Sequence, residues 1–344
     1  MRIGIIGWYG HQNAGDERIL YCLRRLFAAH RLLVVTGFEG ALAQLPELNR
    51  CDLVVLGGGG LILRGCNRYA AIFESLKVPL VGLGLGIEAR HADNQAVLDG
   101  LVQRAEFILV RDRASAQRLG DHPKVLVAPD LTFLYPFHVV PWREEDVCAL
   151  SLRPWHFWRG EYWGKWDKFM RRLSRRVPRF EAVYPLAKWS PARAVGAVRR
   201  HFQQVIPLPL GCASTLENDV GLLRRFFPDV PGEFRPELLG RSRYLVGMRL
   251  HSLIFACQMG VPFVSLSYQP KNAAFCADIG LGPLSVDIYR QHELEEAIEG
   301  MRQRSARWRE HLIVVRQENV RVVWRAVVPL LKELGVSVAT TEAA

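Results

Sequence analysis

The 344-residue sequence lacks paired cysteines and long apolar runs. Its seven cysteines are scattered, mostly within apolar stretches, and none has the CxxC spacing of zinc and redox sites. We expect reduced, buried thiols, with no metal site and no cofactor. The best candidate for a membrane span, residues 53–63, is broken by four glycines and is shorter than the ~20 residues that a spanning helix needs. The sequence therefore argues against a membrane-spanning protein.

The start of the sequence lacks the pattern of a signal peptide. Residues 1–7 (MRIGIIG) are typical of a strand, and they show no charged start, long apolar run or small-residue cleavage site. Internal repeats and low-complexity tracts are also missing. We therefore expect a folded protein of the cytoplasm.

The composition is that of a globular protein with a basic surface. Apolar residues make up 49% of the chain and charged residues 23%, unlike the charge-heavy composition of a disordered chain. A single domain usually has about 100–200 residues, so we expect two domains. The formal net charge of +11 favours an anionic partner, which is nucleic acid, an anionic lipid surface or a phosphorylated small molecule.

Short, continuously apolar strands alternate with helices along the first part of the chain. The pattern predicts helices over 16–28 and from 113, and strands over 3–6, 32–35, 52–56, 78–83, 107–110 and 125–128. Strands that are apolar throughout predict a parallel sheet covered by helices on both faces.

Residues 133–146 are rich in proline, aromatic and charged residues, and we place a domain boundary there. Beyond it the sequence predicts a helix over 252–259, a long C-terminal helix over about 305–334, and strands over 147–152, 182–186, 204–207, 244–247 and 262–267. The predicted domains are residues 1–140 and 146–315, followed by a C-terminal helix and tail, 316–344. The fold class is α/β, with two Rossmann-like, doubly wound domains facing across a cleft, and such sheets bind ligands at the carboxyl ends of their strands.

Glycine-rich segments follow two strands of the first domain. The loop over 7–17 connects a strand to a helix, where backbone N–H groups and the helix dipole attract anions. Gly4, Gly7 and Gly10 have GxxGxxG spacing, which matches a dinucleotide fingerprint poorly, and the alternative is a tight turn capped by Asp16. Residues 57–60 are four glycines at the end of a buried strand, which indicates close approach of either a ligand or a packed helix.

Charged residues follow the next two strands. Arg111 is suited to bind a carboxylate or a phosphate, and the alternative is a pair with Asp112 that ties down the loop. Asp130 is suited to bind a sugar hydroxyl, to act as a base or to cap a helix.

The strongest cluster is GMRLHS over 247–252, where an apolar strand ends and a helix begins. Arg249 brings a permanent cation and His251 a titratable ring. After the next strand, Lys271 reaches the same edge. Arg111, Arg249 and Lys271 converge if the two domains face each other.

A tryptophan-rich basic segment occupies residues 155–176. Its tryptophans and basic residues at helical spacing fit either a helix lying on an anionic membrane or an ordinary helix with a solvated basic face.

Taken in order, several motifs resemble the polysaccharide pyruvyl transferase family: GWYGHQNAGDERIL, DLVVLGGGGLI, ILVRDRASAQRLG, VAPDLTF, LSLRPW, GMRLHSLIFACQMGVPFVSLSY and the lysine of QPKN. They extend from residue 1 to about residue 281, and their order and spacing are specific. The resemblance implies a glycosyltransferase-B-like pair of Rossmann-like domains. It also implies an enzyme that uses phosphoenolpyruvate as co-substrate to place a pyruvate ketal on a sugar of an envelope polysaccharide or exopolysaccharide precursor, often a lipid-linked one.

The resemblance implies roles for the clustered residues. The motifs place phosphoenolpyruvate at Arg111, Arg249, Leu250 and His251, and Lys271 adds a cation for this compact trianion. We assign the phosphate to Arg249, the carboxylate to Arg111, and a proton-transfer or leaving-phosphate role to His251. We assign the acceptor sugar to the first domain, at Asn13, Asp16, Gly58, Gly59 and Asp130.

Two alternatives remain open from the sequence. A nucleotide-sugar glycosyltransferase of the same architecture would use the basic residues to neutralise a diphosphate, although a convincing EX7E-type acidic pair is missing. A non-catalytic nucleic-acid-binding protein would use the basic surface, but the sequence carries no recognised reader module, and we do not expect nucleic acid as a partner. Trp8, His11 and residues 86–88 depart from the family's pattern and predict an unusual acceptor.

Overall fold

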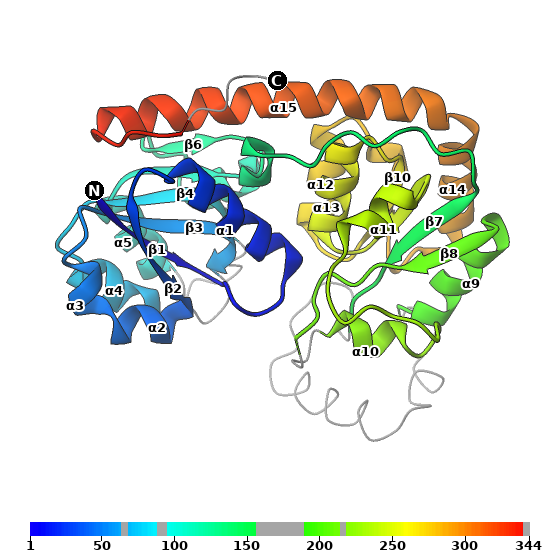
Figure 1. Cartoon of the computed structure of the whole chain (residues 1–344), viewed down its shortest axis with the longest axis horizontal. Coiled ribbons are helices and arrows are strands. Elements are labelled where there is room, and N and C mark those ends of the chain that lie inside the picture. The colour runs from blue at the N-terminus through cyan, green and yellow to red at the C-terminus, as the bar shows by residue number, and fades with distance from the viewer. Residues whose placement is uncertain (63–67, 88–94, 156–188, 214–217, 340–344) are drawn as a thin grey trace. The chain divides into compact units, whose positions relative to one another are not determined.

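The computed structural model describes residues 1–62, 68–87, 95–155, 189–213 and 218–339, and the chain divides into two compact units (Figure 1). Unit 1 comprises Met1–Pro136 with Arg316–Ala344, and unit 2 comprises Phe137–Val315. Each unit contains one parallel β-sheet whose strands alternate with helices along the chain. The predicted α/β class with two Rossmann-like units is confirmed.

The sheet of unit 1 has six parallel strands in the order β2-β1-β3-β4-β5-β6. Its strands are β1 (Arg2–Gly7), β2 (Arg31–Thr36), β3 (Leu53–Ile62), β4 (Leu80–Ile87), β5 (Ala105–Val110) and β6 (Val125–Val127). Its helices are α1 (Ala14–Leu26), α2 (Gly37–Ala43), α3 (Leu45–Leu48), α4 (Arg68–Ser75), α5 (Gln95–Arg104), α6 (Arg113–Arg118) and the 3-10 helix η2 (Leu131–Leu134). The central strands β3 and β4 are buried almost throughout, as continuous apolar runs predict.

The strands β3 and β4 extend further than the sequence predicts. The four glycines at 57–60 lie inside β3, and β4 continues beyond residue 83 through Gly84 and Gly86 to Ile87. Gly57 pairs with Leu83, and Gly59 pairs with Leu85. Backbone pairing needs no side chain, so a glycine run that is usually read as a loop can continue a ladder where it is covered on both faces.

The sheet of unit 2 has five parallel strands in the order β11-β10-β9-β7-β8. Its strands are β7 (Val147–Ser151), β8 (Gln204–Pro207), β9 (Tyr244–Gly247), β10 (Phe263–Ser267) and β11 (Ser285–Asp287). Its helices are α9 (Pro191–His201), α10 (Asp219–Leu223), α11 (Pro236–Arg241), α12 (Leu250–Met259), α13 (Pro270–Asp278), α14 (Leu294–Gln303), and the 3-10 helices η3 (Gly282–Leu284) and η4 (Gln291–Glu293). The strand predicted over 182–186 lies outside the described residues.

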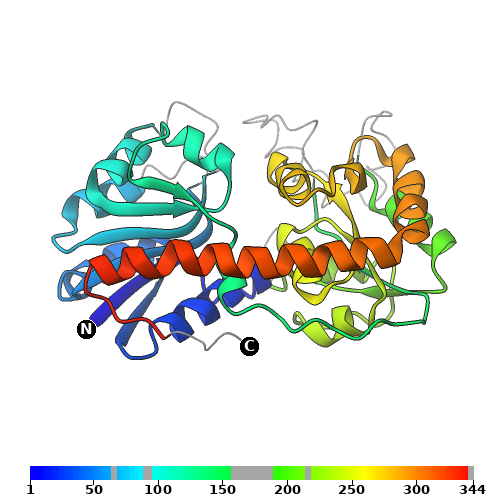
Figure 2. The ribbon, with the colours of Figure 1, turned by 90° about the horizontal axis from the view of Figure 1, so that it is seen from above.

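The predicted long C-terminal helix is α15 (Ser305–Glu333), which Figure 2 shows as one uninterrupted helix. Its second half belongs to unit 1, where the indole Nε1 of Trp324 donates to the carbonyl oxygen of Leu134 at 3.1 Å. After the helix, the amide of Ala339 donates to Leu26 O at 3.0 Å. Residues 316–339, which the sequence set apart as a separate helix and tail, therefore pack as part of unit 1.

The cysteines behave as buried apolar side chains. Five of the six described cysteines are buried and all six are free thiols; the exception in burial is the partly exposed Cys212. Burial raises the pKa of Cys22 to about 12 and that of Cys276 to about 11. Cys66 lies outside the described residues. Among the helices of the described part, none is both long and apolar enough to cross a membrane.

Candidate functional site

The GMRLHS motif lies at the carboxyl end of β9, the middle strand of the unit 2 sheet. Met248 continues the pairing of β9 with β7, because its amide donates to Ser151 O at 2.8 Å. Arg249 then has extended backbone angles and precedes the first turn of α12. The hydroxyl of Ser252 donates to Arg249 O at 2.6 Å. The strand-to-helix turn thus holds Arg249 at the positive end of a ten-residue helix.

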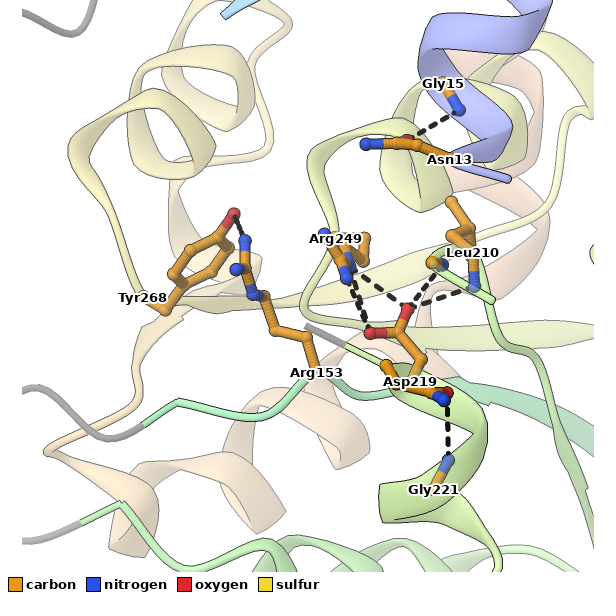
Figure 3. Close-up of polar contacts among 10 residues, drawn as sticks. Asn13, Gly15, Arg153, Leu210, Asp219, Gly221, Arg249 and Tyr268 are labelled. Carbon is orange, nitrogen blue, oxygen red and sulfur yellow. Dashed lines mark hydrogen bonds and ion pairs between the residues drawn. The ribbon is translucent and has the colours of Figure 1, made fainter. Parts of the chain in front are cut away.

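The guanidinium of Arg249 is held by Asp219, a fully buried carboxylate (Figure 3). Arg249 Nη2 donates to Asp219 Oδ1 at 2.7 Å, and Arg249 Nε lies 3.1 Å from Oδ2. Oδ2 also accepts hydrogen bonds from the backbone amides of Leu210 at 3.1 Å and Gly211 at 2.8 Å. Planar, bidentate contact of this kind fixes both the position and the plane of a guanidinium. Arg249 is therefore oriented before any ligand binds.

Sequence reasoning missed Asp219. Its carboxylate follows Asn218, which caps α10 by accepting from the Gly221 amide at 3.1 Å, so the local sequence signals only a helix start. Asp219 and Arg249 are 30 residues apart, and their pairing depends on how the strands β8 and β9 are ordered in the sheet.

His251 and Lys271 lie at the same edge of the unit 2 sheet as Arg249. His251 is half-buried in the first turn of α12, with its ring centroid 5.7 Å from that of Phe255. Lys271 lies in the first turn of α13, which follows β10, the neighbour of β9. The side chain of Leu250, by contrast, is buried in the apolar core. Unit 2 thus gathers three of the predicted site side chains at two adjacent strand ends.

The loop after β1 positions Asn13 and Asp16 in unit 1. Asn13 is the N-cap of α1, and its Oδ1 accepts from the Gly15 amide at 3.1 Å. The expected alternative, a turn capped by Asp16, is wrong, because Asp16 lies inside the first helical turn. Asp16 is buried against β3: Gly59 has a φ of 75°, and a Cβ there would overlap Asp16 Oδ1.

Close packing of α1 on β3 also accounts for Gly58, where a Cβ would overlap the side chain of Ile19. Other contacts hold the loop. The hydroxyl of Tyr9 donates to Gly57 O at 2.8 Å, and burial raises the pKa of Tyr9 well above its ordinary value. The indole of Trp8 is 46% exposed and stacks on His11, with the ring centroids 3.8 Å apart.

Arg111 and Asp130 follow β5 and β6 of unit 1. The buried Arg111 side chain pairs with Asp112, with Nε 3.6 Å from Oδ2, and a Cβ at Gly86 would lie 2.5 Å from its Cζ. Asp112 also caps α6, since it accepts from the Ser115 amide at 2.7 Å. The buried Asp130 caps η2, with Oδ1 accepting from the amide of Thr132 at 2.9 Å and from its hydroxyl at 2.8 Å. The Arg111–Asp112 ion pair and the helix cap by Asp130, which the sequence analysis gives as alternatives to ligand binding, are therefore both formed.

The predicted site residues fall into two groups. Arg249, Leu250, His251 and Lys271 belong to unit 2, whereas Arg111, Asn13, Asp16, Gly58, Gly59 and Asp130 belong to unit 1. In the described ranges, His, Cys, Asp and Glu side chains do not form a group of three that could hold a metal ion. Of the tryptophan-rich segment only Trp155 is described, and residues 156–176 lie outside the described part.

A sequence model of the polysaccharide pyruvyl transferase family matches residues 13–184 and 237–270, more than half of the chain. The matched ranges contain the predicted site residues of unit 1 together with Arg249, Leu250 and His251. Lys271 lies one residue beyond the match, and Asp219 lies between its two parts. Comparison with curated proteins gives no match.

Solved structures of nucleotide-sugar enzymes share the fold. HepE from Anabaena, solved with UDP and glucose, has a TM-score of 0.55 at 12% identity and covers 97% of this chain and 100% of its own. The spinosyn rhamnosyltransferase SpnG has a TM-score of 0.57 at 11% identity, with 96% and 100% coverage. UDP-GlcNAc 2-epimerase from Neisseria meningitidis, bound to UDP-GlcNAc, has a TM-score of 0.51 at 9% identity, with 97% and 100% coverage. At these identities the likeness concerns the fold, which is glycosyltransferase-B-like.

Proposed function

The chain belongs to the polysaccharide pyruvyl transferase family, and from this membership we propose that it transfers the pyruvyl group of phosphoenolpyruvate to a sugar of an envelope polysaccharide or exopolysaccharide precursor. The observation that carries the proposal is Arg249, which lies inside the matched range, begins a helix at a central strand end and is pre-oriented by a buried carboxylate. A fixed guanidinium in this position suits a phosphate or a carboxylate.

The charge of phosphoenolpyruvate fits the residues at the edge of unit 2. The molecule carries up to three negative charges in a small volume, so its binding requires several cations or helix N-termini. In our proposal Arg249, the N-terminus of α12 and Lys271 bind the phosphate, while Arg111 of unit 1 binds the carboxylate. The backbone of Leu250 lies between the two functional side chains of the motif.

The proposed reaction conserves atoms and charge without a cofactor. One sugar hydroxyl attacks the central carbon of phosphoenolpyruvate while the methylene carbon gains a proton and becomes a methyl group. The bond from the central carbon to the phosphate oxygen then breaks, and a second hydroxyl attacks the same carbon to close the ketal. Of the two hydroxyl protons that the sugar loses, one balances the proton on the methyl group and the other leaves with inorganic phosphate.

His251 is the proposed proton-transfer residue of this sequence of steps. It sits one helical residue beyond Leu250, on the same helix start as Arg249, and its ring is half-buried. A half-buried imidazole beside the phosphate can deliver a proton to the departing oxygen, which is a general-acid role.

The acceptor sugar is proposed to bind at the carboxyl edge of the unit 1 sheet. Asp16 and Asp130 offer carboxylates to sugar hydroxyls, and Asn13 offers an amide at the start of α1. Gly58 and Gly59 are proposed to contribute indirectly, because their missing Cβ atoms let α1 pack on β3 and keep Asp16 at this edge. We place the reaction in the cytoplasm, on a saccharide precursor that is free or lipid-linked, and the net charge of +11 suits contact with the inner membrane surface.

Thermal unfolding with a panel of ligands tests the proposal. A ligand that binds only the folded state adds about 2.7 kcal/mol of stability at a concentration of 100 Kd. We expect phosphoenolpyruvate to raise the Tm, and pyruvate, UDP and UDP-GlcNAc to have little effect. Arg249→Ala should abolish the shift, whereas Arg200→Ala, whose side chain is 61% exposed on α9, should retain it.

The nucleotide-sugar alternative gives the opposite result. Two of the solved neighbours named above, HepE and the UDP-GlcNAc 2-epimerase, contain UDP or UDP-GlcNAc, which makes these compounds the appropriate comparison. A shift with UDP compounds and none with phosphoenolpyruvate would replace the pyruvyl transferase by a glycosyltransferase. Release of inorganic phosphate from phosphoenolpyruvate that requires a saccharide acceptor would establish the transfer itself.

A further inference from the structure

Trp8 is an exposed aromatic side chain on the loop between β1 and α1. It follows the carboxyl end of β1, which pairs with the central strand β3. The residue is 46% exposed, and Trp8 and Tyr21 are the exposed large aromatic residues of the described part. Exposure alone is common for apolar side chains. What distinguishes Trp8 is how firmly its ring is held.

His11 supports the indole of Trp8 from one side. The two rings are stacked, with their centroids 3.8 Å apart and an angle of 14° between their planes. His11 Nε2 lies 3.5 Å from the hydroxyl oxygen of Thr36, the last residue of β2. The same hydroxyl donates to the carbonyl oxygen of Tyr9. The imidazole therefore lies between the end of β2 and the indole, and it fixes the plane of the indole.

Gly37 leaves room for the six-membered ring of the indole. It begins α2 with a φ of 62°, and a Cβ at this position would lie 3.3 Å from Trp8 Cζ3. Thr36 precedes α2 as its N-cap but forms no side-chain cap hydrogen bond, and its hydroxyl binds the loop instead. The start of α2 is thus shaped around Trp8. The part of the indole that His11 and Gly37 leave uncovered faces solvent.

The backbone of this loop is fixed by its own contacts. The hydroxyl of Tyr9 donates to Gly57 O at 2.8 Å, and the amide of Gly10 donates to Glu17 Oε1 at 2.7 Å. Gln12 has a φ of 52°, a left-handed conformation that few non-glycine residues adopt. Strained backbone of this kind gathers at ligand-binding sites. A ring on a fixed loop loses little conformational freedom when a ligand stacks on it.

The charges on the loop favour a neutral ligand. The Glu17 carboxylate accepts from the amide of Gly10. The amide of Gly15 donates to Asn13 Oδ1. The carboxylate of Asp16 is buried in the first turn of α1. These two carboxylates balance the positive end of the helix dipole, which would otherwise attract an anion. The loop is therefore better suited to hydroxyl groups than to a phosphate.

A pyranose ring fits both the exposed ring and these charges. One face of such a sugar carries axial C–H groups, whose hydrogens bear partial positive charge and pack on the negative face of an aromatic ring. Its edge carries hydroxyl groups that carboxylates and amides can bind. A nucleobase also stacks on an indole, but a nucleotide would bring phosphate groups next to two carboxylates. The ring and the charges together therefore favour a sugar.

We propose that Trp8, supported by His11, is a stacking platform for a pyranose ring of the saccharide that unit 1 binds. The platform adds an apolar contact to Asn13 and Asp16, which lie next to the same loop and are proposed to bind hydroxyl groups. That this saccharide is the acceptor of pyruvyl transfer rests on the proposed function. Trp8 then selects the acceptor by the shape of one ring face, and the polar residues select it by its hydroxyl groups.

Saturation-transfer NMR with the methyl glycosides of glucose, galactose, mannose and N-acetylglucosamine tests the platform. We expect at least one glycoside to receive saturation from the wild-type protein, most strongly at the hydrogens of one ring face. Trp8→Ala should weaken the binding of that glycoside by about fivefold, the effect of losing one aromatic contact, and Trp8→Phe should lose less. Tyr21→Ala is the matched control, because Tyr21 is 40% exposed on α1 of the same unit, and it should bind as the wild type does.

Two results of this experiment would overturn the platform. The first is equal saturation in the wild type and in Trp8→Ala, and the second is the absence of saturation of all four glycosides by the wild type. Uridine, a nucleoside without phosphate, is the third probe. Saturation of uridine in place of the glycosides, lost in Trp8→Ala, would overturn the choice of a sugar.

His11 carries the test if Trp8→Ala does not fold, which its Tm reveals. His11→Phe keeps a flat ring behind the indole and should bind the glycoside as the wild type does. His11→Ala removes this support and should weaken binding by about two- to threefold, because the indole is no longer held in one plane. Equal binding by the two His11 variants would reject the supporting role of the imidazole.

The two proposals fail in different ways. If the wild type binds a glycoside through Trp8 but does not bind phosphoenolpyruvate, the platform stands and the pyruvyl transfer falls. If the wild type releases phosphate from phosphoenolpyruvate with a saccharide acceptor, and Trp8→Ala has the same acceptor KM, the pyruvyl transfer stands and the platform falls.

Discussion

The carboxyl edges of the two sheets differ in the chemistry that follows their strands. In unit 1 the buried carboxylates Asp16 and Asp130 stand at this edge, and the cation Arg111 is paired with Asp112. In unit 2 the edge carries Arg153, Arg249 and Lys271 with aromatic neighbours. Both edges are built on parallel strands of the same kind, so the residues after the strands decide the ligand class. Carboxylates suit neutral hydroxyl groups, and cations suit anions.

The two edges also differ in what holds them together. The edge of unit 1 depends on glycines in β3, because α1 packs directly against their backbone and leaves no room for a side chain. The edge of unit 2 depends on a long-range ion pair between Asp219 and Arg249. The stability of unit 1 should therefore be most sensitive to side-chain volume added at these glycines, and the stability of unit 2 to the loss of a charged side chain from the pair.

The largest effect is expected from His251→Ala in unit 2. Removing a general acid or base typically lowers the rate by about 10²–10⁴-fold, and the fold should remain intact because the ring is only half-buried. The measurement is phosphate release from phosphoenolpyruvate in the presence of a saccharide acceptor. A variant that retains more than a tenth of the wild-type rate would remove His251 from the chemistry.

Asp219→Ala should cause the largest loss of stability. The substitution leaves the Arg249 guanidinium buried beside an empty position, and breaking a buried pair costs about 3–5 kcal/mol. Urea unfolding measures the change in the free energy of unfolding. Glu295→Ala, which breaks a surface pair with Arg200, is the control and should cost less than about 1 kcal/mol. Similar losses in the two variants would mean that Asp219 does not hold a buried charge.

Gly59→Ala tests the packing of unit 1. The alanine would have to adopt a φ of 75° and would also overlap the Asp16 carboxylate, so we expect a loss of about 2–4 kcal/mol from backbone strain and overpacking together. Gly10→Ala is the control, because Gly10 has a φ of 77° and open space around its Cβ position. Its backbone strain should cost about 1–2 kcal/mol. If both variants lost the same stability in thermal unfolding, contact with Asp16 would contribute nothing.

The smallest change is expected from Asp130→Ala. Loss of the cap on η2 should reduce stability by about 1 kcal/mol, and Asp130→Asn should preserve most of it. If the edge of unit 1 binds the acceptor, both variants should raise the acceptor KM and leave the Kd for phosphoenolpyruvate unchanged. A raised Kd for phosphoenolpyruvate would contradict the assignment of Asp130 to the acceptor.

The sequence predicts features that depend on neighbouring residues. Continuous apolar runs located most strands, and the strand-to-helix turn at GMRLHS was found at its observed place. The sequence pattern is a less reliable guide to the N-cap of α1, which is Asn13 and not Asp16. Both residue types suit an N-cap, and the two positions differ by about one helical turn. The sequence pattern predicts that the glycines of β3 follow the strand, whereas they lie inside it, because glycine weakens a strand unless the tertiary structure covers it.

Contacts between distant residues were not predictable. Asp219 reaches Arg249 across 30 residues, and Arg153 reaches Tyr268 across 115. Both contacts follow from the strand order β10-β9-β7-β8, which brings together chain segments that a single sequence does not connect. LSLRPW marked Arg153 as part of a motif that resembles the family, but its hydrogen bond to Tyr268 follows only from the strand order.

Unit 1 is assembled from the two ends of the described chain, and this has a consequence for its synthesis. Tyr135 and Leu26 hydrogen-bond to Ala339, and Trp324 hydrogen-bonds to Leu134, so these contacts form only when the last part of the chain is available. Domains generally fold as units while the ribosome is still extending the chain. Unit 2 is complete in one continuous stretch, whereas unit 1 emerges first and must wait for residues that are translated after the whole of unit 2. The half translated first is therefore the half that finishes folding last.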